Sequence, residues 1–164
     1  MKKFLLLAII AVFSISAFSQ VPISVGDKQL NFGIGNHGNR NFRSNVFYVG
    51  FDYCVFNDIT IGGNLGLSFY SKSSISIITF VPAFVGDYHF NTLIGIPSEF
   101  DFYAGLDLGL PVYFGDLTGT GDLDIGTHVG GRWYWDEKWG LNLQMGLGFI
   151  SGSSGFGFGL SMRM

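Results

Sequence analysis

The chain has 164 residues, of which 48% are hydrophobic and only 13% are charged, and its formal net charge is −3. This length allows one domain, the low charge excludes a disordered chain, and the absence of a basic excess excludes a nucleic-acid-binding protein. Soluble domains carry roughly a quarter of their residues as charged side chains, and a chain of this size cannot bury all the rest. The composition therefore favours a membrane environment.

The first twenty residues are typical of a secretory signal peptide. A basic start precedes an apolar run over residues 4–13, and Ala-Phe-Ser at 17–19 is a small-x-small cleavage site. The apolar run is too short to span a bilayer comfortably. We expect residues 1–19 to be removed, residues 20–28 to form a short periplasmic segment, and residues 29–164 to form an outer-membrane β-barrel.

The single cysteine excludes stabilisation by intramolecular disulfides or by metal–thiolate clusters. Cys54 is the only cysteine, so the chain forms no intramolecular disulfide and offers no thiolate cluster to zinc or iron–sulfur. A small exported domain without disulfides needs another source of stability. A closed, fully hydrogen-bonded sheet would supply it, and we expect no cofactor and no resident metal.

The rest of the chain alternates between apolar residues and small or polar residues, which is the period of a β-strand. It contains no run of 18 apolar residues that would predict a transmembrane helix, and frequent glycines disfavour long helices. Alternation is clearest over residues 100–114, whereas the facing of residues 75–83 is ambiguous. In chain order the pattern predicts eight strands, at about residues 30–34, 47–55, 59–69, 76–90, 100–114, 125–135, 141–149 and 156–164.

An even number of antiparallel strands can close into a barrel, which removes the unpaired edges that hydrocarbon does not tolerate. A soluble lipocalin-like barrel would point its apolar face inward and carry many charges outside. Here the polar face is dominated by glycine, which suits a narrow interior, and the uncharged apolar face suits lipid. The sequence therefore predicts an all-β fold, an eight-stranded antiparallel up-and-down transmembrane β-barrel with its apolar face to lipid and a glycine-rich, polar lumen.

Aromatic residues cluster near both expected ends of the strands, as in the interfacial girdles of transmembrane barrels. The first predicted girdle contains Trp133, Trp135, Trp139, Phe90, Phe100 and Phe102. The second contains Phe69, Phe114, Phe149 and Phe156.

Charged residues on the inward face are the candidate functional groups. A buried charge must be paired, so we favour a polar plug in which Arg132 bridges several carboxylates, although an ion or proton path is an alternative. Asp107 and His128 lie on neighbouring predicted strands, but no Ser or Cys nucleophile accompanies them, which disfavours a catalytic triad. The predicted lumen cluster comprises Asp52, Asp87, Asp101, Asp107, His128 and Arg132.

Three other patterns favour ordinary structural roles. The loop at residues 116–124 places carboxylates among glycines, but their spacing matches no calcium-binding pattern. The alternating glycines at 155–159 lack the strand–turn–helix context of a nucleotide site and read as the interior of a strand. Arg40 and Arg43 lie in an expected outer loop, where contact with lipopolysaccharide phosphates is possible but simple solvation is commoner.

The signal peptide, the eight alternating strands and the apolar C-terminal strand resemble the small OmpX- and OmpA-type outer-membrane barrels of Gram-negative bacteria. The Ala-Phe-Ser cleavage site is similar to those of exported Bacteroidota proteins. In this family the last strand is the recognition signal for the barrel-assembly machinery. The resemblance implies that role here for Phe156, Phe158, Leu160, Met162 and Met164, and it implies contact with outer-membrane lipid and lipopolysaccharide.

Three functions are compatible with these features. The one we favour is a non-enzymatic barrel with a structural or surface-interaction role in the envelope and a polar-plugged lumen. A narrow cation-preferring pore is the alternative. A lipid-modifying enzyme is a minor alternative, because such barrels pair a His with a Ser at the lipid-facing rim and no such pair occurs on a predicted outward face. We expect a monomer in the outer membrane, reached by signal-dependent export, without a nucleic-acid partner.

Overall fold

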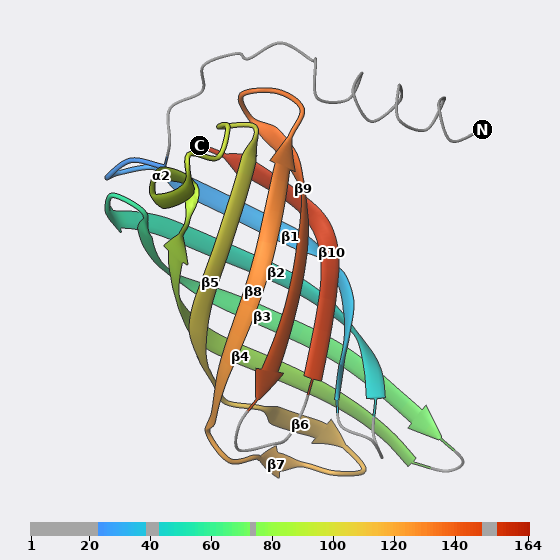
Figure 1. The fold of residues 1–164 in the computed structure, drawn as a ribbon. Helices are drawn as coiled ribbons and strands as arrows, with labels where there is room; N and C mark the ends of the chain where they lie inside the picture. The colour runs from blue at the N-terminus through green and yellow to red at the C-terminus, as the bar shows by residue number, and fades with distance from the viewer. Residues whose placement is uncertain (1–22, 39–42, 73–74, 149–153) are drawn as a thin grey trace, which may run out of the picture.

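The computed structural model describes residues 23–38, 43–72, 75–148 and 154–164, and these form one closed β-barrel (Figure 1). The expected signal peptide lies outside the described residues. Each barrel strand pairs antiparallel with the next, and the first strand closes the ring by pairing with the last. The ring comprises β1 (Lys28–Gly38), β2 (Arg43–Phe56), β3 (Ile59–Lys72), β4 (Ile75–His89), β5 (Phe100–Gly109), β8 (Asp124–Tyr134), β9 (Trp139–Gly148) and β10 (Ser154–Arg163).

The predicted eight-stranded antiparallel barrel is thus confirmed, and each strand lies within a few residues of its expected position. Within the described part of the chain, no helix is long and apolar enough to cross a bilayer. The one short helix there is α2 (Asn91–Ile94), which ends at Gly95 in the left-handed conformation. It lies in the connection between β4 and β5.

One predicted strand, over residues 100–114, is divided in the structure. It separates into β5 and β6 (Val112–Gly115), and both pair with β4 in the same register. The break lies where the Pro82 carbonyl accepts the Leu110 N–H, because Pro82 has no N–H to donate in return. Pro111 follows and also lacks a donor. Two prolines on neighbouring strands therefore interrupt one ladder.

Beyond this break, β6 turns back into β7 (Gly119–Thr120) to make a small hairpin at one end of the barrel. The Asp116 side chain accepts the Ser76 N–H at 2.8 Å, which fixes the hairpin to the start of β4. Figure 1 shows this hairpin at the end opposite to the C-terminus, the beginning of β1 and α2. We call these two ends the hairpin end and the terminal end.

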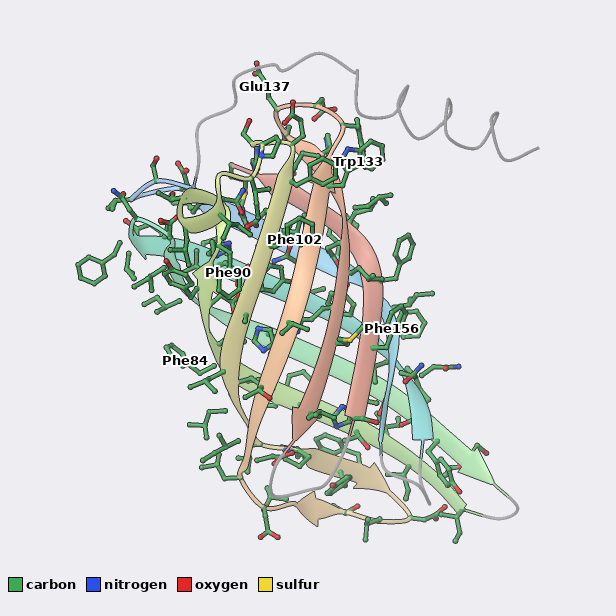
Figure 2. All side chains as sticks on the ribbon, viewed as in Figure 1. Phe84, Phe90, Phe102, Trp133, Glu137 and Phe156 are labelled. Atoms are coloured by element: carbon green, nitrogen blue, oxygen red, sulfur yellow. The ribbon has the colours of Figure 1, made fainter. Side chains whose placement is uncertain are left out.

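Side chains alternate across the barrel wall as the sequence predicts. Outward residues such as Leu106 (59% exposed) are apolar, whereas inward residues such as Asp101 (0% exposed) are polar and buried. Figure 2 shows Phe84 and Phe156 projecting outward from the wall. The register also resolves residues 75–83, since Thr79 lies opposite the buried Ser68 and therefore faces the lumen.

Candidate functional site in the barrel lumen

Strand register places the charged side chains of the lumen in two rows, one at Asp101 and the other four residues further along β5, at Gly105. Asp101 on β5 lies directly opposite Arg132 on the neighbouring β8. Asp87 on β4 and His128 on β8 lie on either side of Gly105, which is on the strand between them. All of these side chains occupy inward positions of the alternation. The charged cluster of the lumen is therefore a product of register and strand parity together.

Arg132 is the centre of this cluster. Its Nη1 donates to Asp101 Oδ2 at 2.8 Å, and its Nη2 donates to Asp52 Oδ2 at 2.8 Å. The guanidinium also lies 4.2 Å from the centroid of the Tyr103 ring, a cation–π contact. β2 and β8 are four strands apart in the eight-stranded ring, so the bridge from Arg132 to Asp52 crosses the full width of the lumen.

Two histidine–aspartate pairs flank this bridge. His89 Nδ1 lies 2.7 Å from Asp101 Oδ1, and its Nε2 lies 3.0 Å from the Thr60 hydroxyl. His128 Nε2 lies 2.7 Å from Asp87 Oδ1. Asp52, Asp87 and Asp101 therefore each contact a guanidinium or an imidazole, and none of these three buried carboxylates lacks a polar partner.

A chain of neutral hydrogen bonds connects the cluster to the other side of the barrel. The Tyr48 hydroxyl donates to Asn142, the Asn142 amide donates to Ser161, and the Ser161 hydroxyl donates to Asn31. The Asn31 amide in turn donates to Asp52 at 2.8 Å. These bonds join four strands across the lumen and hold the Asp52 carboxylate toward Arg132.

Glycines make room for the large inward side chains. A Cβ on Gly105 would collide with the Asp87 carboxylate, one on Gly126 would collide with the Asp107 carboxylate, and one on Gly130 would collide with the Tyr103 ring. Each glycine is the cross-strand neighbour of the residue that it admits. At these three positions the space over a lumen glycine is therefore filled by a side chain from the neighbouring strand.

A few buried polar atoms of the described residues have no hydrogen-bond partner, among them Arg132 Nε and Asn64 Oδ1. Both residues line a lumen cavity of about 20 Å³ beside Asp52 and Asp87. A polar cavity of that size has room for about one water molecule. His128 Nδ1 and Asp107 Oδ2 also have no partner, and neither residue lines this cavity.

Asp107 stands apart from the other predicted cluster members. Its side chain is 39% exposed, and its Oδ2 lies 3.9 Å from His128 Nδ1, which is too long for a hydrogen bond. The register explains this, because Asp107 pairs with Gly126 and His128 pairs with Gly105, so the two side chains are diagonal neighbours. Asp107 therefore borders the cluster on the side of the hairpin end.

Two buried lumen residues, His89 and Tyr103, were not among the predicted site residues. His89 is fully buried against Asp101, and Tyr103 packs against Arg132, His89 and His128. The neutral residues Tyr48, Asn142 and Ser161 were also missed. Their inward parity was the available signal, but parity does not distinguish a residue in the network from one that only fills space.

Aromatic residues of the first predicted girdle lie toward the terminal end. Trp133, Trp135 and Phe102 are exposed on the outside, and Figure 2 shows Trp133 near this end. Trp139 is half-buried against Phe32, and Phe102 stacks on Phe100. In the second predicted girdle, Phe149 lies outside the described residues, whereas the outward, exposed members are Phe69, Phe114 and Phe156.

The turn between β8 and β9 is fixed by Asp136. Its carboxylate accepts the Lys138 N–H at 2.8 Å and the Trp139 N–H at 2.6 Å. These backbone donors stabilise the charged form and lower the pKa of Asp136. The neighbouring Glu137 projects from the same turn in Figure 2.

The C-terminal strand carries the residues that the resemblance assigns to assembly. Phe156, Phe158, Leu160 and Met162 alternate along β10 between β1 and β9. Met164 follows the strand, and its N–H donates to the Lys28 carbonyl at 2.9 Å. This bond places the end of the chain beside the start of the barrel.

No metal site is found among the described residues, where no three His, Cys, Asp or Glu side chains are arranged to hold an ion. This includes the carboxylates of the loop at residues 116–124. The alternating glycines at 155–159 lie inside β10, as the sequence reading expected.

A scan against protein-family models and a search of the curated proteins found no match to this sequence. The solved structures are more informative. OprG of Pseudomonas aeruginosa superposes with a TM-score of 0.66 at 10% identity, over 86% of this chain and 97% of OprG. The fold is that of the small outer-membrane barrels.

Two further structures agree. Neisserial surface protein A gives a TM-score of 0.61 at 14% identity, over 84% of this chain and 95% of its own. Ail, the attachment invasion locus protein of Yersinia pestis, gives 0.57 at 10% identity, over 85% and 99%. At such identities the likeness shows the fold and leaves the activity open. The expected relation to Bacteroidota proteins stays a prediction.

Proposed function

We propose that this protein is an integral outer-membrane barrel, without enzymatic activity, whose charged cluster closes the lumen and whose outer loops serve a structural or surface-interaction role. The outward face supports the membrane assignment. Large apolar side chains such as Leu106, Leu147 and Phe158 are about half exposed along the strands. Exposed apolar area on that scale is unfavourable in water and suits hydrocarbon.

The observation that carries the closed lumen is the bridge from Arg132 to Asp52. It joins strands on opposite sides of the ring, and Arg132, Asp52 and Asp101 are all buried. An ion entering the lumen would have to separate these charge-assisted pairs. The barrel would then have a structural or surface-interaction role in the membrane and would not conduct ions.

Planar-bilayer recording of the refolded mature protein tests this proposal. We expect wild-type conductance close to background, because the pairs around Arg132 block the axis. Replacing Arg132 with Ala should open the lumen and produce a cation-preferring conductance, since the inward aspartates stay. A matched control is Arg163→Ala, which removes a cation that stacks on Tyr134 and donates to the Ser98 carbonyl; it should leave the conductance at background.

A narrow cation-preferring pore is the second candidate. It is favoured by the partly exposed Asp107 at the side of the hairpin end and by the small polar cavity beside Asp52 and Asp87. A steady, cation-selective conductance of the wild-type protein would make the pore the leading function and the inward aspartates its selectivity residues.

Partners follow from the same proposal. Outer-membrane lipid and lipopolysaccharide would surround the apolar face, and the barrel-assembly machinery would recognise β10 during biogenesis. We propose a monomer, since closure leaves no unpaired edge in the ring. Membrane insertion itself is checked by comparing boiled and unboiled samples on detergent gels, where a soluble, detergent-independent monomer would contradict the proposal.

A further inference from the structure

Gly131 and Gly63 both face outward on the barrel wall but differ in their surroundings. Gly131 on β8 is covered, because carbons of the Phe102 ring lie 3.1 Å from the position of a Cβ. Gly63 on β3 pairs with Phe51 on one side and Phe84 on the other, and neither ring covers it. The nearest atom to a Cβ at Gly63 is the Ala83 carbonyl oxygen at 3.6 Å. The outer surface is therefore hollow at Gly63.

This hollow is a groove of about 430 Å³ across β2, β3 and β4. Phe51, Leu65 and Phe84 form its walls, and each of these side chains is itself exposed. Figure 2 shows the Phe84 ring standing away from the wall. No charged residue lines the groove, so its chemistry matches a hydrocarbon.

The groove must be filled from outside the described chain. An unfilled space loses the dispersion contacts of every atom that lines it, and the neighbouring side chains do not lean over Gly63 as Phe102 leans over Gly131. An apolar cavity of about 150 Å³ already binds benzene, and this groove is larger. It is continuous with the apolar outer face that the proposed function places in the bilayer.

A second copy of the chain is a poorer occupant. Ten residues line the groove, whereas a stable protein interface takes about 20–30 residues on each side. The floor is one glycine wide between two phenyl rings, which would keep the backbone of a neighbouring strand away. A flexible alkyl chain needs no such approach.

We propose that an acyl chain of a bilayer phospholipid occupies the groove over Gly63, between Phe51 and Phe84. This inference rests on the proposed membrane location. The groove would be a specific lipid-binding site, whereas the rest of the outer face would contact bilayer lipids non-specifically. At Gly63 only backbone separates the groove from the lumen cavity beside Asp52 and Arg132, because Gly63 lines both spaces. The bound chain therefore covers the wall next to the charged cluster.

Native mass spectrometry tests the site after the protein is refolded in phosphatidylethanolamine–phosphatidylglycerol vesicles and transferred to detergent. Gly63→Leu fills the groove, and Gly86→Leu is the matched control. Gly86 is also an outward strand glycine with an open Cβ position, but it does not line the groove. Wild type and Gly86→Leu should retain one phospholipid, and Gly63→Leu should retain about tenfold less, as for a loss of one decade in affinity.

Equal retention by all three proteins would overturn the site. So would a wild-type dimer that Gly63→Leu abolishes, since the occupant would then be a second copy. If Gly63→Leu fails to insert, Phe84→Ala replaces it. That variant removes one wall, the same loss of phospholipid is expected, and unchanged retention would overturn the site.

Insertion is measured separately by the shift between boiled and unboiled samples on detergent gels. A wild-type protein that does not insert contradicts the membrane proposal. A wild-type protein that inserts, but whose lipid retention does not depend on Gly63, contradicts the groove alone.

Discussion

The inner and outer faces of this barrel are made from alternate residues of the same strands, but they differ in how specific their contacts are. Inside, Arg132 contacts two particular carboxylates from strands that are far apart in the ring. Outside, Leu106 and other large apolar residues expose about half of their surface. The contacts in the lumen therefore require particular residues at particular positions. The outer face requires mainly that its side chains be apolar.

This difference predicts how substitutions act on each face. In the lumen, removing one partner leaves another group buried and unsatisfied, so the loss depends on the pair. On the outer face an apolar residue can replace another with little effect, but a charge is costly because lipid cannot solvate it. Changes on both faces can be compared in one assay, urea unfolding from lipid vesicles.

The largest effect is expected for Arg132→Ala. It leaves Asp52 and Asp101 without their common cation, and breaking a buried pair from one side costs about 3–5 kcal/mol. The free energy of unfolding should fall by that amount. Adding Asp52→Asn should restore part of the loss, because the amide removes one of the uncompensated charges. If Arg132→Ala unfolds at the wild-type urea concentration, the pairs do not hold the lumen together.

Much of the fold could be predicted from the sequence, because strand parity is a local property. Period-two alternation located the eight strands and both faces, including the inward Asp52 and Arg132. The break between β5 and β6 was missed because it requires Pro82 of β4 to lie opposite Leu110, which is a non-local pairing. The alternation within one strand does not show which residues of the neighbouring strand pair with it.

The site could be predicted only as a set of candidates. Parity placed Asp107 in the lumen, but its height relative to His128 depends on the stagger of β5 against β8. The bridge across the lumen depends on closure of the whole ring. The groove at Gly63 depends on which way Phe51 and Phe84 lean, and no sequence pattern carries that information.

A charge on the outer face should have the next largest effect. Leu106 is 59% exposed near the middle of the strand formed by β5 and β6, so Leu106→Arg places a cation in the hydrocarbon at a cost of about 2–4 kcal/mol. Leu117→Arg is the matched control, since Leu117 is similarly exposed (52%) but lies in the β6–β7 hairpin. It should change the free energy of unfolding by less than about 1 kcal/mol. Equal losses in the two variants would mean that the outer face of β5 does not contact lipid.

The smallest effect compares one substitution, Gly→Ala, on the two faces. At Gly130 the new methyl group would overlap the Tyr103 ring, which cannot swing away because its hydroxyl donates to Gln144 at 3.1 Å and its face contacts Arg132. Overfilling a well-packed site costs about 1–3 kcal/mol.

At Gly86, whose Cβ position faces outward and has its nearest neighbour at 4.0 Å, the same change should be neutral or stabilise the barrel by about 0.5–1 kcal/mol, because alanine loses less backbone entropy than glycine on folding. The double variant Gly130→Ala, Tyr103→Ala should lose less free energy of unfolding than the sum of the two single variants. Without the Tyr103 ring, the new methyl group has nothing to overlap, and it fills part of the space that the ring leaves. Additive losses, or equal losses at Gly130 and Gly86, would show that the lumen glycines are not there to admit the large side chains opposite them.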